Sequence, residues 1–141
     1  GLAEAGSNIV LCSRKVAVCE ASCAELENLG VKTLAVACDV TQPAQVEALK
    51  DAVLKKFGRV DVLMNNAGRA WVAPPEDMPV DRWQKVIDVN LTGAFLFSQA
   101  AGREMLKAGY GIVGLAGGMV LAPWLERFYR RITHHEDGKH G

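Results

Sequence analysis

The sequence predicts an α/β fold built on a parallel sheet. Short apolar, β-branched runs alternate with longer stretches whose apolar residues recur at helical spacing, and glycines stand where the helices should end. Strands connected through helices run parallel with right-handed crossovers, which gives the order β-α-β-α-β-α-β. The strands are expected at 8–12, 31–37, 60–64 and 112–116, and the helices at 14–29, 43–57 and 80–107.

Local signals define the ends of these elements. The chain opens on what looks like the last turn of a helix, which Gly6 ends. Ser13 is placed to cap the helix that follows the first strand. Pro43 lies in the first turn of the next helix, where its missing N–H costs nothing, and Gly58 ends that helix. Residues 71–79 hold three prolines without periodicity, which predicts a loop.

Composition excludes several functional classes. Lys plus Arg and Asp plus Glu each number 16 among 141 residues, a balance that argues against a nucleic-acid partner. No apolar run is long enough to span a membrane, and a single cytoplasmic domain is expected. The chain begins mid-pattern at Gly1 without a methionine, so we expect a further piece upstream.

The four cysteines are interpreted as reduced thiols of a cytosolic protein. All of them lie in apolar or helical contexts: Cys12, Cys19, Cys23 and Cys38. Cys19 and Cys23 are four residues apart on a predicted helix, but no second pair of ligands stands nearby. Metal binding is therefore not expected.

The stretch VDVLMNNAG, residues 60–68, is the strongest candidate for a functional segment. An apolar run typical of a buried parallel strand ends at Asn65, and two amides followed by two small residues allow close backbone approach. Ligands of open α/β sheets bind outside the carboxyl ends of the strands. An asparagine-rich turn explains the isolated motif equally well.

Arg14 and Lys15 are expected in the first turn of a helix, where the helix dipole disfavours cations. A phosphate held by the helix N-terminus, the Ser13 hydroxyl and the Arg14 guanidinium would explain them. The alternative is that both side chains extend into water, at a cost of only a few tenths of a kcal/mol.

Two further polar residues follow or interrupt apolar patterns. Asp39 comes just after a strand and is placed either to accept a hydrogen bond from an adenine amino group or to cap a helix. Asn90 interrupts the predicted apolar stripe of the 80–107 helix. A buried amide there must bond a backbone carbonyl or hold a water at an active site, and the structural role is favoured.

The strings CDV, VDVLMNNAG and DVNLTGAF, at this spacing, resemble the short-chain dehydrogenase/reductase family over residues 2–116. The nearest type resembles gluconate 5-dehydrogenase and 3-oxoacyl reductase. The resemblance implies a Rossmann-like doubly wound parallel sheet and a nicotinamide cofactor. An acid after the second family strand favours NAD, whereas this chain has Ser13 and Arg14 there, which implies NADP. The resemblance implies a catalytic role for Asn90, which matches the asparagine that positions a water in the family's proton relay. The cofactor contacts that it implies are Ser13, Arg14, Asp39, Val40, Asn66, Ala67 and Gly68.

The chain departs from the family at both ends. The family's first strand and glycine-rich loop would precede Gly1. In the strand order 3-2-1-4-5 that strand lies between 8–12 and 60–64, so two interior edges are expected to stay unpaired. At the other end, Gly117 stands where the catalytic serine is expected, and Tyr129 is followed four residues later by Thr133, not lysine. The expected domains are therefore a partial dinucleotide-binding domain over 1–116 and a divergent, poorly ordered tail over 117–141.

Two functions of different classes follow from the resemblance. The first is a fragment of an NADP-dependent oxidoreductase, acting on a small-molecule carbonyl or alcohol and inactive as this chain alone. The second is a catalytically dead interaction protein that pairs with a full-length relative through the 80–107 helix, since the parent enzyme is expected to be a homo-oligomer. A third hypothesis is a Rossmann-type methyltransferase, but the NNAG and VNLTG strings argue against it.

Overall fold

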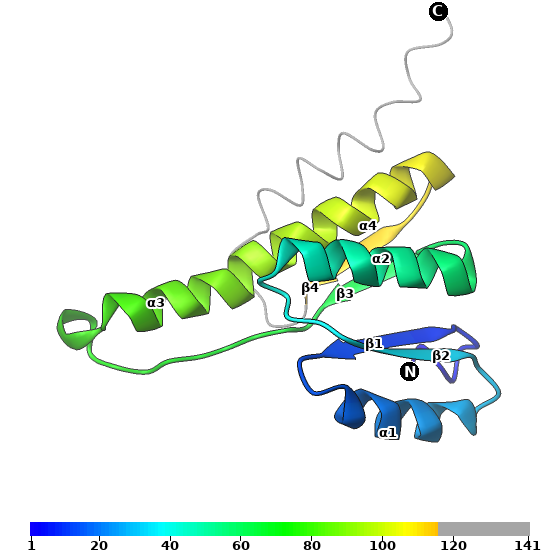
Figure 1. Ribbon diagram of the computed structural model, residues 1–141, viewed down its shortest axis with the longest axis horizontal. Coiled ribbons are helices and arrows are strands. Elements are labelled where there is room, and N and C mark those ends of the chain that lie inside the picture. The colour runs from blue at the N-terminus through cyan, green and yellow to red at the C-terminus, as the bar shows by residue number, and fades with distance from the viewer. Residues whose placement is uncertain (116–141) are drawn as a thin grey trace, which may run out of the picture.

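A computed structural model of the chain describes residues 1–115. Four strands alternate with helices in the predicted order (Figure 1). The strands are β1 (Ile9–Ser13), β2 (Thr33–Ala37), β3 (Val62–Asn65) and β4 (Ile112–Leu115). The helices are α1 (Val16–Glu27), α2 (Pro43–Phe57), α3 (Val80–Ile87) and α4 (Ala94–Ala108), with a short 3₁₀ turn at Pro75–Asp77 and a π-helical segment at Asp88–Gly93.

Glycine signals predict the chain reversals correctly. Gly6, Gly58 and Gly109 have φ angles of 86°, 77° and 80°, in the left-handed region that residues with a side chain rarely adopt. Around Gly6, Ser7 N–H donates to the Leu2 carbonyl and Gly6 N–H to the Ala3 carbonyl, the bonding pattern of a helix C-terminus. Pro43 opens α2, as expected.

The sheet is divided in two. β1 pairs in parallel with β2, and β3 pairs in parallel with β4, but no ladder joins β1 to β3 among residues 1–115. This confirms the expectation that two interior edges stay unpaired. All four strands run in the same direction in Figure 1, so their carboxyl ends meet at one edge of the molecule.

One helical layer covers both halves of the sheet. α2 and α4 pack against each other, and their side chains form the main core with strand residues of both halves. α1 lies on the opposite face of β1 and β2 (Figure 1). The buried members of this core are Cys38, Val46, Leu49, Val53, Phe97 and Ala100. The shared layer packs on both halves, although no strand ladder joins them within residues 1–115.

The predicted 80–107 helix is partly wrong. The chain is helical from Val80 to Ala108, but the Asp88–Gly93 segment is a π-helix, which divides it into α3 and α4. No residue of α3 is buried, and Trp83 is 55% exposed. Fully buried residues begin only at Gly93, because α3 extends past the end of the sheet (Figure 1).

The Gly93→Ala variant should be measurably destabilised. A Cβ at Gly93 would lie 2.8 Å from Val40 Cγ2 and 3.2 Å from the Val40 carbonyl oxygen. Overpacking of this kind costs about 1–3 kcal/mol, whereas replacing a helical glycine with alanine returns up to about 1 kcal/mol. We expect a net loss of about 1–2 kcal/mol of unfolding free energy in a denaturant titration of the whole protein. An unchanged midpoint would show that the π-helical segment does not need this close approach.

Candidate functional site

The end of β1 forms a tight turn around the Ser13 hydroxyl. Ser13 Oγ donates to the Lys15 carbonyl at 2.8 Å and accepts from the Lys15 N–H at 3.1 Å. Helix α1 therefore begins only at Val16, with Lys15 as its N-cap and without a side-chain capping bond. The expectation that Ser13 caps the helix, and that Arg14 and Lys15 lie in its first turn, is wrong, because the hydroxyl closes its own turn two residues on. Both cations instead flank the helix N-terminus and are exposed.

Asp39 lies beside this turn. The N–H of Cys38 donates to the Ser13 carbonyl at 3.0 Å, which brings the ends of β1 and β2 together. Asp39 Oδ1 accepts from the Thr41 N–H at 3.0 Å and the Thr41 hydroxyl at 2.8 Å. These two bonds, with a smaller contribution from the Arg14 guanidinium, hold the pKa of Asp39 below its ordinary value, against the opposing effect of burial. A carboxylate at neutral pH thus stands near the Arg14 cation.

The segment after β3 is anchored at its start and open at its end. Asn65 donates from Nδ2 to the buried Ser98 hydroxyl on α4 at 3.2 Å. Asn66, Ala67 and Gly68 are exposed. A Cβ at Gly68 would meet nothing closer than the Asn90 side-chain oxygen at 3.8 Å, an ordinary contact. The protein neighbours therefore leave room for a side chain at position 68. A ligand lying along the backbone would fill that room and so require glycine.

Asn90 is joined to this segment through Arg69. Its Oδ1 accepts from the Arg69 N–H at 2.7 Å, and its Nδ2 donates to the Arg69 carbonyl at 2.9 Å. The predicted burial of Asn90 is wrong, since the residue is exposed, in the π-helical segment that α3 carries beyond the sheet. The predicted structural role is confirmed in its hydrogen bonding, because the amide pairs with backbone as another peptide unit would. π-Helical turns of this kind are frequent at functional sites.

Val40 connects the two halves of the site. It follows Asp39 directly and packs against Gly93, the last residue of the π-helical segment that contains Asn90. Through this contact and the Asn90–Arg69 hydrogen bonds, the end of β2 is connected to the segment after β3. Sequence reasoning named Val40 and Asn90 but missed Gly93, Ser98 and Arg69. The only signal for Gly93 was its place in the VNLTG string.

Metal-ligating side chains, thiols and long apolar helices were also sought within residues 1–115. No group of three or more His, Cys, Asp or Glu side chains within residues 1–115 is arranged to hold a metal ion. All four cysteines, which lie in that part of the chain, are free thiols, and burial raises the pKa of the Cys12 thiol to about 11. No helix in the same residues has the length and apolarity to cross a membrane.

Comparison with known proteins identifies a family. A model of the short chain dehydrogenase family matches residues 1–117. A hydroxy-methyl-oxo-hexahydroindene-carboxyl-CoA reductase of Mycobacterium tuberculosis (strain ATCC 25618 / H37Rv) is 38% identical over 137 residues, which are 96% of this chain and 51% of that protein. D-threitol dehydrogenase of Mycolicibacterium smegmatis is 47% identical over 77 residues, 55% of this chain and 30% of that enzyme. The chain thus spans about a third to a half of the length of these relatives.

Solved structures agree with this result. A short-chain type dehydrogenase/reductase from Mycobacterium marinum superposes with a TM-score of 0.77 at 36% identity, over 80% of this chain and 45% of that one. NAD⁺-bound xylitol dehydrogenase gives 0.78 at 36% identity, over 81% and 44%. A metagenomic short-chain oxidoreductase in complex with NADP gives 0.78 at 30% identity, over 86% and 55%. Together with the family match, these likenesses show that the chain belongs to the short-chain dehydrogenase/reductase family of NAD(P)-binding oxidoreductases.

Proposed function

We propose that the whole protein is an NADP-dependent oxidoreductase that acts on a small-molecule carbonyl or secondary alcohol. The observation that carries the proposal is the Ser13 turn, residues 13–15, which presents the Arg14 side chain. An exposed guanidinium stands at the N-terminus of α1, and the Cys38 N–H to Ser13 carbonyl bond holds this turn beside the end of β2, which Asp39 follows. The first turn of α1 holds no acidic side chain.

The turn suits a phosphate better than a pair of ribose hydroxyls. A phosphate dianion is attracted by the guanidinium and by the positive end of the helix dipole, and Arg14 offers the planar donor pair that phosphates accept. Lys15 adds a second exposed cation. NADP carries a phosphate on its adenosine ribose and NAD does not, so this turn would favour NADP. The solved relatives include complexes with either cofactor, which leaves the choice to the residues of this turn.

The remaining candidates take roles consistent with their contacts. Asp39 uses Oδ1 for Thr41, and its second oxygen would accept from the adenine amino group. Val40 would pack on the adenine ring, and Asn66, Ala67 and Gly68 would lie along the cofactor. Asn90 would hold the 66–69 backbone against the π-helical segment. The bound cofactor would supply or accept the hydride at its nicotinamide.

A further strand with a glycine-rich loop would complete the site. β1 and β3 lie under one layer formed by α2 and α4, and neither pairs with the other within residues 1–115. We propose that this strand occupies the space between them and brings the pyrophosphate-binding loop to the same edge. We also propose that the 141-residue chain alone does not reduce carbonyls. Gly117 and Tyr129, the positions that depart from the family's catalytic pattern, lie outside the described residues.

The Gly68→Ala variant tests the cofactor assignment. Because the new methyl group has room among the protein neighbours, stability should change by less than about 0.5 kcal/mol. A cofactor lying on the backbone would meet that methyl, so NADPH affinity should fall about tenfold or more. Thermal unfolding and fluorescence titration of NADPH with the whole protein measure the two effects.

The matched control is Gly93→Ala, which adds the same methyl group against protein atoms. It should lower stability and leave NADPH affinity less affected than Gly68→Ala does. NADPH affinity that is unchanged in Gly68→Ala would show that no ligand lies along residues 66–68, and the proposed site would then be wrong.

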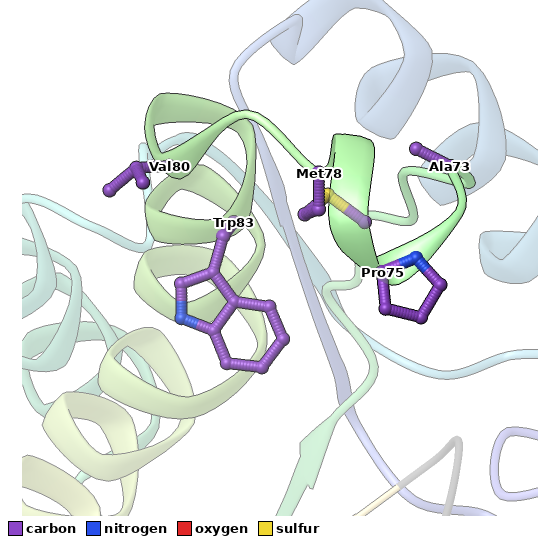
Figure 2. A pocket seen from close by; sticks show the side chains of 5 residues that line it. All are labelled: Ala73, Pro75, Met78, Val80 and Trp83. Atoms are coloured by element: carbon purple, nitrogen blue, oxygen red, sulfur yellow. The ribbon is translucent and has the colours of Figure 1, made fainter.

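An apolar hollow between α3 and the segment that precedes it favours a second candidate function. Its walls are Ala73, Pro75, Met78, Val80 and Trp83, and Figure 2 shows Trp83 on α3 beside Pro75 and Met78 of the preceding segment. Val80 is 80% exposed, so α3 presents apolar surface to its surroundings. We infer that α3 is suited to pairing with a full-length relative or with another copy in a homo-oligomer. Co-purification with the full-length relative, lost in Trp83→Glu, would support this; a monomer unaffected by the change would oppose it.

A further inference from the structure

We propose that Cys19 is a positioning residue that sets the preference of the site for NADP, by fixing the Ser13 turn that presents Arg14. The inference rests on the proposed function, because it concerns how the phosphate of NADP would be recognised. It assigns a role to a buried thiol that contacts neither the cofactor nor the substrate.

The Ser13 hydroxyl has no capacity left for a ligand. A serine hydroxyl has one proton to donate and two lone pairs to accept with. The proton goes to the Lys15 carbonyl, and the lone pairs accept from the Lys15 N–H and from the Cys19 thiol, whose Sγ lies 3.3 Å from Ser13 Oγ. A phosphate on this turn would therefore be held by Arg14 and not by Ser13.

Cys19 is the only described residue outside the turn whose side chain bonds the Ser13 hydroxyl. It lies in α1, one helical turn beyond the Lys15 N-cap, and is 7% exposed. Since packing fixes a buried side chain, its S–H occupies one lone pair of Ser13 Oγ and leaves the hydroxyl proton directed to the Lys15 carbonyl. Loss of that contact frees the turn, and Arg14, at its apex, then samples more orientations.

The same helix provides a matched control. Cys23 lies one turn further along α1, is also a buried free thiol at 6% exposure, and makes no hydrogen bond to the Ser13 turn. Cys19→Ala and Cys23→Ala therefore remove the same atom from equally buried positions on one helix. A general loosening of α1 would affect both variants, whereas an effect through Ser13 appears only in the first.

The experiment measures dissociation constants of NADPH and NADH for the whole protein, for Cys19→Ala, Cys23→Ala and Cys19→Ser. Because S–H···O bonds are weak, we expect Cys19→Ala to reduce the ratio of NADPH to NADH affinity by about two- to fivefold, through NADPH alone. Cys23→Ala should leave the ratio unchanged. Cys19→Ser keeps a donor on the same side chain and should retain more of the preference than Cys19→Ala.

Three results would overturn the inference: an unchanged ratio in Cys19→Ala, an equal fall in Cys23→Ala, or a fall caused by tighter NADH binding with NADPH affinity unchanged. They are distinct from failure of the proposed function. If the unmutated protein binds neither dinucleotide, or binds both equally, the proposed function fails and the turn has no preference for Cys19 to set.

Discussion

Changing Arg14 to alanine should remove most of the preference for NADPH over NADH. A hydrogen bond to a charged group contributes about 1.5–3 kcal/mol. Arg14 is exposed, so solvent screening favours the lower end of that range, about tenfold in affinity. NADH affinity should change little, because NADH has no phosphate at this position. Isothermal titration of the whole protein with each cofactor gives both constants.

Two further substitutions sharpen this result. Arg14→Lys keeps the charge but loses the planar fork, so its NADPH affinity should lie between those of the wild type and Arg14→Ala. Lys15→Ala should have a smaller effect than Arg14→Ala, because Lys15 is the N-cap and Arg14 is at the apex of the turn. A preference for NADPH that persists in Arg14→Ala would show that another group recognises the phosphate.

Changing Asn90 to alanine should lower kcat of the whole protein about 100-fold, since misplacing a catalytic segment by about 1 Å costs that much. The substitution removes both hydrogen bonds that tie the π-helical segment to the backbone of Arg69. These bonds are exposed, so the loss of stability should be no more than about 1 kcal/mol. Steady-state kinetics and thermal unfolding separate the two effects.

Gln84 supplies the control for Asn90. Its Nε2 donates to Asp88 Oδ1 at 2.7 Å, so Gln84→Ala also removes an exposed side-chain hydrogen bond close to the π-helical segment. It does not touch residues 66–69, and kcat should stay within about twofold of the wild type. If Asn90→Ala and Gln84→Ala have equal kcat values, the Asn90–Arg69 pair has no special role in catalysis.

Local sequence signals predicted most of the fold. Gly58 and Gly109 end their helices in the left-handed conformation, and Pro43 opens α2, because these residues carry their backbone preference with them. The alternation of apolar runs and helical stripes predicted four parallel strands, and the family's strand order predicted which edges stay unpaired. These features depend on neighbours in the sequence or on a shared topology.

Other features depend on contacts that no local pattern encodes. A serine before a helix looks the same whether its hydroxyl caps that helix or closes its own turn, and Ser13 does the second. The apolar stripe of 80–107 does not reveal that α3 extends past the sheet and leaves Trp83 exposed. The Asn90–Arg69 pair and the Gly93–Val40 contact join distant segments, so only the structure brings these halves of the site together.

Amide NMR spectra of the whole protein during NADP titration test the central claim most directly, because they report which residues the cofactor contacts. We expect shifts at residues 13–15, 39–40 and 66–69, the three segments at the carboxyl ends of β1, β2 and β3. NADP should also cause larger shifts than NAD at Arg14 and Lys15. Shifts absent from these segments, or confined to the hollow around Trp83, would contradict the assignment of a dinucleotide site to this edge.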